Sequence, residues 1–253
     1  MSNNVIFHMD EFNRARLVES HQFYVREAKK RLLCHFDNIE EEALLHAQAW
    51  LGANHHRFNP ERDDAGDFHT SAHEQGAALY FLLSDMRVRT RLSVVSGMYH
   101  EWDKQLREWL VDEVKSWYFG DKLINLIWKS DISLIFELLV TMGFDIRSKP
   151  YFRSLDACRL VVNVYKHGAG GSFDSLKVNY PTFLHISATS SSSDIHHEDV
   201  NVDDRQFSEI SDAIVSFWAD VPEKVTKSQF ANFPQWFQRA FAADNTPRKK
   251  VFS

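Results

Sequence analysis

The spacing of apolar positions predicts a chain built almost entirely from helices. Apolar residues recur three or four positions apart over most of the 253 residues, and only 9 glycines and 6 prolines interrupt them. We therefore predict an all-α fold. The expected helices span about 10–36, 39–58, 69–86, 89–118, 129–142, 148–168 and 204–218.

Local signals support several of these boundaries. Asp37 or Asn38 is expected to cap the second helix, because an acidic first turn follows immediately. Gly143 is expected to stop the helix over 129–142, since glycine ends helices without steric cost. The polar segment 59–66 reads as a connection between helices.

The chain is predicted to comprise four segments. Residues 1–60 form an N-terminal helical extension, 61–186 a helical core, 187–204 a connector rich in serine and acidic residues, and 205–253 a C-terminal helix with a docking tail. The connector is expected to be exposed and to contribute little core. Two sets of aromatic residues are expected to be packed inside, namely Trp102, Trp109 and Trp117 together with Phe233, Trp236, Phe237 and Phe241.

Composition narrows the class of protein. With 44% hydrophobic residues the chain can bury a large core, and its net charge of −6 leaves any nucleic-acid binding to a local patch. The two cysteines, Cys34 and Cys158, are expected to be buried and unpaired, which fits a reducing cytoplasm. No signal peptide is expected at the N-terminus, and the apolar stretch 132–144 is too short to span a bilayer, so no membrane association is expected.

The candidate chemistry lies on the helix that ends near residue 168. Arg159, Asn163 and His167 recur every fourth residue, which places them within about 80° of one helix face. The intervening Leu160, Val161 and Val164 are expected to pack inward. The polar stripe is therefore a candidate site for a phosphate group.

The loop after this helix extends the candidate site. Its backbone N–H groups from Gly168 to Ser172 can approach a phosphate closely, because glycine has no side chain. The same glycines also serve as an ordinary helix stop, which is their commoner role.

Two segments resemble the HEPN (higher eukaryote and prokaryote nucleotide-binding) superfamily. The sequence RLSVVSGMYHE at 91–101 resembles an earlier family helix, and NVYKHG at 163–168 resembles the end of the late helix with its Arg-Asn-x-x-x-His pattern. The resemblance covers roughly residues 86–184. It implies a HEPN-like helical bundle, here with added N-terminal and C-terminal helices.

The resemblance also implies a function, because many HEPN proteins are ribonucleases of phage defence or toxin systems. They cleave RNA without metal or cofactor, by attack of the ribose 2′-hydroxyl on the adjacent phosphate. His167 would then be the general acid or base, Arg159 would stabilise the phosphate charge, and Asn163 would orient the imidazole. Lys166, Gly168 and Ser172 would bind substrate, and a homodimer would complete the active face.

The sequence departs from the family at one position. The arginine commonly stands immediately before the polar residue, and Val162 occupies that place, while Arg159 lies about one helical turn earlier. The structural alternative is that Arg159 pairs with Asp156 or Glu101, while Asn163 and His167 satisfy the helix end. Two further functions stay open: a non-catalytic module that binds a protein partner, such as an antitoxin or scaffold, and a sensor of a nucleotide.

Two histidine pairs elsewhere in the chain are candidate metal ligands. His69 and His73 have the i, i+4 spacing that zinc uses, but no third ligand accompanies them. His196 and His197 fall in an acidic loop whose spacing fixes no coordination geometry. We therefore predict no metal site.

Overall fold

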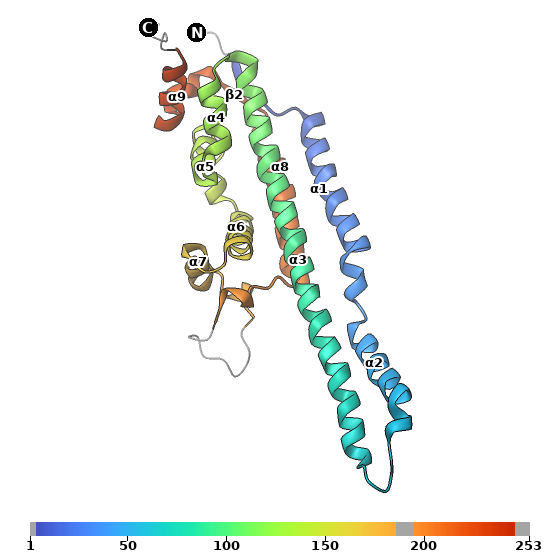
Figure 1. Cartoon of the computed structure of the whole chain (residues 1–253). Coiled ribbons are helices and arrows are strands. Elements are labelled where there is room, and N and C mark those ends of the chain that lie inside the picture. The colour runs from blue at the N-terminus through green and yellow to red at the C-terminus, as the bar shows by residue number, and fades with distance from the viewer. Residues whose placement is uncertain (1–3, 186–194, 246–253) are drawn as a thin grey trace, which may run out of the picture. The chain divides into compact units, whose positions relative to one another are not determined.

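The computed structural model describes residues 4–185 and 195–245 and is mostly helical (Figure 1). Two short strands, β1 (Val5–His8) and β2 (Lys224–Thr226), form an antiparallel pair. The prediction of a helical chain is confirmed, with this small sheet added. The helices are α1 (Glu11–Arg31), α2 (Ile39–Asn54), α3 (Ala65–Trp117), α4 (Asp121–Lys129), α5 (Ile132–Thr141), α6 (Phe152–His167), α7 (Gly171–Asn179), α8 (Asp204–Asp220) and α9 (Gln235–Asn245).

The chain divides into two compact units. The hairpin unit is Val25–Val95, and the main unit combines Met1–Tyr24 with Ser96–Ser253. The division falls within α1 and α3, so each of these helices contributes residues to both units. The four segments expected from the sequence remain a prediction.

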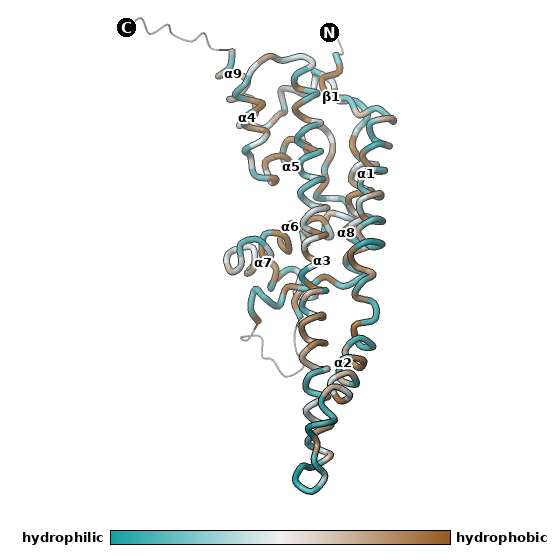
Figure 2. Tube along the Cα trace, turned by 45° about the vertical axis from the view of Figure 1, so that its right-hand side comes forward, coloured by the Kyte–Doolittle hydropathy of each residue, from teal (hydrophilic) through white to brown (hydrophobic). Residues whose placement is uncertain are grey.

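In the hairpin unit, α2 runs antiparallel to the first part of α3 (Figure 1). The connection between them is hydrophilic, as the sequence predicts (Figure 2). Phe68 packs beside Trp50 and Phe58, with ring centroids 5.2 and 5.5 Å apart. Gly76 lies so close to α2 that an added Cβ would be 2.8 Å from the carbonyl oxygen of Ala43. The two helices therefore approach closely where this glycine stands.

The core of the main unit is built around the tryptophans of α3. Trp102 is 1% exposed and meets Phe217 of α8 edge-on, with ring centroids 5.1 Å apart. The indole N–H groups of Trp109 and Trp117 donate to the carbonyl oxygens of His8 and Ile6, at 3.0 and 2.7 Å. These bonds fix β1 against α3. Trp102 and Trp109 are buried, as predicted, whereas Trp117 is half-buried.

A buried arginine connects α3 to α4 and α5. Arg107 is 6% exposed, and its guanidinium contacts both carboxylate oxygens of Asp103 at 3.0 Å. It also donates to the carbonyl oxygens of Ile127 at 2.6 Å and Ser130 at 2.9 Å. These carbonyl groups lie at the C-terminal end of α4, where the helix has no N–H donors for them. The Arg107 side chain alone therefore satisfies groups that the helix leaves unpaired.

The C-terminal helix docks on α4. The carboxylate of Asp244 accepts from the backbone N–H groups of Lys122 and Leu123, at 3.1 and 3.0 Å, and so caps the first turn of α4. Phe237 is fully buried, and Phe241 packs on Tyr118 with ring centroids 4.7 Å apart. Of the four aromatic residues expected to be packed inside, Phe233 and Phe237 are buried, and Trp236 and Phe241 are half-buried.

Several helix boundaries differ from the prediction. One helix, α3, replaces the two expected over 69–118, because nothing near residues 86–89 breaks the backbone hydrogen bonding. The helix expected from 129 begins instead at Ile132, because the Asp131 side chain accepts from the N–H of Ser133 and caps α5 there. The sequence pattern did not predict α4, α7, α9 or either strand, which are all short elements.

Part of the predicted connector belongs to the core, which corrects the expectation of an exposed segment. Leu184 and Val200 form an antiparallel bridge, and the N–H of His185 donates to the carbonyl oxygen of Asp199 at 2.7 Å. Val200 and Val202 are buried, because alternate residues of this extended segment face the protein. The serines at 190–193 and the basic residues at 248–250 lie outside the described residues.

The cysteine prediction is half correct. Both thiols are free, and Cys158 is buried in α6, where burial raises the pKa of its thiol. Cys34 is exposed, because it lies in a short 3-10 turn outside the regular helices, where only Phe36 is buried.

We predict that Arg107→Ala lowers the free energy of unfolding by about 3 kcal/mol or more, because it leaves buried carbonyl groups and Asp103 without their donor. Urea unfolding followed by circular dichroism measures the change. Arg205→Ala is the control, since this exposed side chain pairs only at the surface with Glu209, at 3.7 Å. Equal stability of the two variants would contradict the role given to Arg107.

A second prediction concerns His21, a buried side chain of α1 whose Nε2 lies 3.0 Å from the hydroxyl of Ser211 in α8. Burial lowers the pKa of His21 below its usual 6.5. Below pH 6.5 the unfolded chain therefore binds a proton that the folded chain resists, so stability falls as pH falls from there. Urea midpoints at pH 7.5 and 5.5 should differ more for the wild type than for His21→Gln. An identical pH dependence would refute this.

Candidate functional site

The candidate site occupies α6, which packs against α7 and α8 in the main unit. Leu160, Val161 and Val164 are 0–2% exposed, as predicted, because they face the core of this unit. The polar residues Arg159 and Asn163 are half-buried, and His167 is exposed at the last position of the helix. The predicted face of α6 is therefore present.

Arg159 is held by a carboxylate on its own helix. Its Nη2 and Nε lie 2.7 and 3.0 Å from Oδ1 of Asp156. The hydroxyl of Tyr180 donates to the other carboxylate oxygen of Asp156 at 2.9 Å, and burial together with Asp156 raises the pKa of Tyr180 to about 12. Of the two carboxylates that the structural alternative proposed, Arg159 thus pairs with Asp156.

Arg159 also acts on the start of α5. The pKa of Asp131 is lowered mainly by the hydrogen bond from the N–H of Ser133, and further by the positive charges of Arg159 and Arg107. The guanidinium of Arg159 therefore lies among carboxylates that already offset its charge.

Arg159 and His167 do not meet. Eight residues of helix separate them by about 12 Å along the axis. The guanidinium turns toward Asp156, three residues before it, and so away from His167. Among the described residues, neither Asn163 nor His167 has a side-chain hydrogen-bond partner. In this arrangement one phosphate cannot contact both charged groups of a single chain.

Val162, at the position where the family pattern has arginine, is 1% exposed. It belongs to the apolar side of α6 that packs into the main unit. An arginine at position 162 would have to place its guanidinium in the core. This position of α6 therefore cannot present an arginine to solvent as the family pattern requires.

The turn after α6 provides the other candidate groups. Gly168 ends the helix with φ of +73°, a conformation that favours glycine. Lys166 is exposed beside it, and Ser172 is half-buried in the first turn of α7. The N-cap of α7 is Gly170, which has no side chain, and within the described part of the chain no side-chain hydrogen bond caps this helix. Lys166, His167 and the start of α7 therefore lie within one short segment.

The sequence does not predict two features beside α6, one at the turn after the helix and one near its start. The ring of His197 lies against Gly168, where an added Cβ would be 3.2 Å from its Cδ2. A second feature is a cavity of about 220 Å³ whose lining includes Arg153, Tyr180 and Arg205. The Arg153 guanidinium lies 5.2 Å from the centre of the Tyr180 ring. Neither contact has a signal in the spacing of the sequence.

His69 and His73, which have the spacing of a zinc-binding pair, are both exposed on α3. Within residues 4–185 and 195–245, no three histidine, cysteine or acidic side chains are grouped to hold a metal ion. No helix of this described part is long and apolar enough to cross a membrane.

No family model, curated protein or solved structure matches the chain.

We predict that Val162→Arg destabilises the protein by more than about 3 kcal/mol, because it forces an unpaired charge into the core. Val178→Arg is the control, since Val178 of α7 is 80% exposed. Urea unfolding of both variants tests the placement. A Val162→Arg protein as stable as the wild type would show that this position reaches solvent.

Proposed function

We propose that the chain binds RNA at the turn between α6 and α7 and cleaves it as a HEPN-like, metal-independent endoribonuclease of a phage-defence or toxin system. The observation that carries the proposal is the exposed imidazole of His167, next to Lys166 and to an α7 start without a side-chain cap. A cation and free N–H groups suit a phosphate. The register of Asn163 and His167 with the HEPN pattern adds the reaction class.

In this proposal His167 removes the proton of the ribose 2′-hydroxyl as that oxygen attacks the neighbouring phosphorus. The P–O5′ bond breaks, the leaving oxygen takes up a proton, and a 2′,3′-cyclic phosphate remains. Imidazole suits both proton transfers because it titrates near neutral pH. Lys166 and the N–H groups at the start of α7 stabilise the charge on the phosphate.

Arg159 joins this chemistry only if it leaves Asp156, or if a second copy of the chain presents it. The paired geometry instead favours a second candidate function, a HEPN-like module that binds a nucleotide or a protein partner without chemistry. The specific observations in its favour are the Arg159–Asp156 ion pair at 2.7 Å and the buried Val162.

We predict that the purified chain, incubated with total RNA and EDTA, produces fragments with cyclic-phosphate ends. His167→Ala should reduce cleavage at least about a hundredfold, because it removes the acid–base group. His100→Ala, a change at an exposed histidine of α3, is the control and should leave the rate unchanged. End-group analysis and gel electrophoresis measure the products.

The role of Arg159 is resolved by a pair of variants. If Arg159 acts after leaving Asp156, Arg159→Ala abolishes cleavage and Asp156→Asn increases it. If the pair is structural, both variants lower the melting temperature and leave the rate per folded molecule unchanged. A wild type that cleaves no RNA would overturn the first proposal, and RNA binding without cleavage would favour the second candidate.

A further inference from the structure

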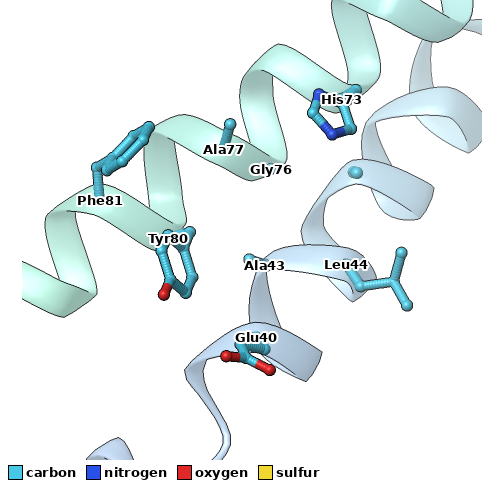
Figure 3. A pocket seen from close by; sticks show the side chains of 9 residues that line it. Glu40, Ala43, Leu44, His73, Gly76, Ala77, Tyr80 and Phe81 are labelled. Atoms are coloured by element: carbon cyan, nitrogen blue, oxygen red, sulfur yellow. The ribbon is translucent and has the colours of Figure 1, made fainter. Parts of the chain in front are cut away.

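The hairpin unit carries an apolar groove of about 310 Å³ between α2 and α3 (Figure 3). Its lining includes four small residues and three large ones, namely Ala43, Ala47, Gly76 and Ala77 together with Leu44, Tyr80 and Phe81. All of them belong to Val25–Val95, so the groove is a feature of this unit alone.

Side-chain sizes in this part of the hairpin are the reverse of those in an ordinary core. Along the groove the small residues Ala43 and Gly76 are buried, whereas Leu44 is 60% exposed and Phe81 70% exposed. The close approach of α2 leaves no room for a side chain at position 76 itself. Large apolar groups that stay in water cost free energy, so this face gains stability if another surface covers it.

The groove has the properties of a surface that fits itself. It presents protruding apolar groups, Leu44 and Phe81, beside a hollow above Gly76 and Ala77. In a two-fold interface the same patch meets its own copy, so each protruding group can enter the hollow of the other chain. Helices that pack in this manner interlock as knobs into holes.

The charges along the groove are also complementary under two-fold symmetry. Glu40 and His73 lie at opposite ends of the groove, and both side chains are exposed (Figure 3). An antiparallel copy brings Glu40 of one chain to His73 of the other at both ends. A carboxylate and an imidazole placed in this way form a hydrogen bond, whereas a parallel copy would place Glu40 against Glu40.

We infer that two copies of this chain associate through this groove, with their hairpin units antiparallel, to form a four-helix bundle. Phe81 and Leu44 of each copy fill the hollow of the other, and Glu40 pairs with His73 across the interface. This arrangement stands on the hairpin unit alone, so it holds or fails independently of RNA cleavage by the main unit.

Sedimentation of the full chain tests the inference, and we predict a dimer at micromolar concentration. Phe81→Asp should raise the dissociation constant at least about a hundredfold, because it places a carboxylate in the apolar interface. Leu45→Asp is the matched control, because Leu45 is 56% exposed and does not line the groove. This variant should dimerise as the wild type does. Circular dichroism verifies that both variants keep their helices.

Exchange of the charges tests the antiparallel orientation. His73→Glu places two carboxylates together at each end of the interface and should weaken the dimer about tenfold or more. Combining it with Glu40→Lys creates two lysine–glutamate pairs and should restore association. A wild-type chain that stays monomeric, a dimer that Leu45→Asp disrupts as strongly as Phe81→Asp, or a double variant as weak as His73→Glu would each overturn the inference.

Discussion

The main unit depends on one buried cation. Arg107 extends from α3 and holds the carbonyl groups at the end of α4, while Asp103 offsets its charge. Because the helix end has no donors of its own, the connection between α4 and α5 takes its course from this side chain. The start of α5 then carries Asp131, whose charge is stabilised by Arg107 and by Arg159 of α6. Arg107 thus holds the end of α4 and the start of α5 against α3. The interaction between Asp131 and Arg159 then connects α5 with α6, the helix of the candidate site.

The same electrostatics determine what the α6 face can do. Arg159 lies among Asp156, Tyr180 and Asp131, so the two carboxylates already offset its positive charge. His167 lies beyond these groups, at the exposed end of the helix. Under the proposed function, a phosphate ligand would meet the imidazole and the backbone N–H groups first, and would gain the guanidinium only by competing with Asp156. The proposal therefore rests on the exposed turn after α6 and not on the stripe as a whole.

Periodicity predicted most of the fold, because long amphipathic helices leave a strong repeat in the sequence. It placed Leu160, Val161 and Val164 inside and ended α6 at Gly168, as the structure shows. It failed where distant residues decide: α4 takes its cap from Asp244, more than a hundred residues away. Asp156, three residues before Arg159, was one of the two partners that the sequence suggested for this arginine. No pattern indicated that Tyr180 donates to the Asp156 carboxylate or that His197 lies against Gly168.

The two units solve the problem of burying apolar surface in different ways. The main unit packs tryptophan and phenylalanine from several helices around Trp102, which is nearly inaccessible to water. The hairpin unit has only two helices where α2 faces α3, and two cylinders in contact share one narrow strip. Small residues at Ala43 and Gly76 bring the backbones together, and Leu44 and Phe81 remain outside that strip. Two helices alone cannot bury such large side chains. A further layer of structure must pack on them before these side chains can leave water.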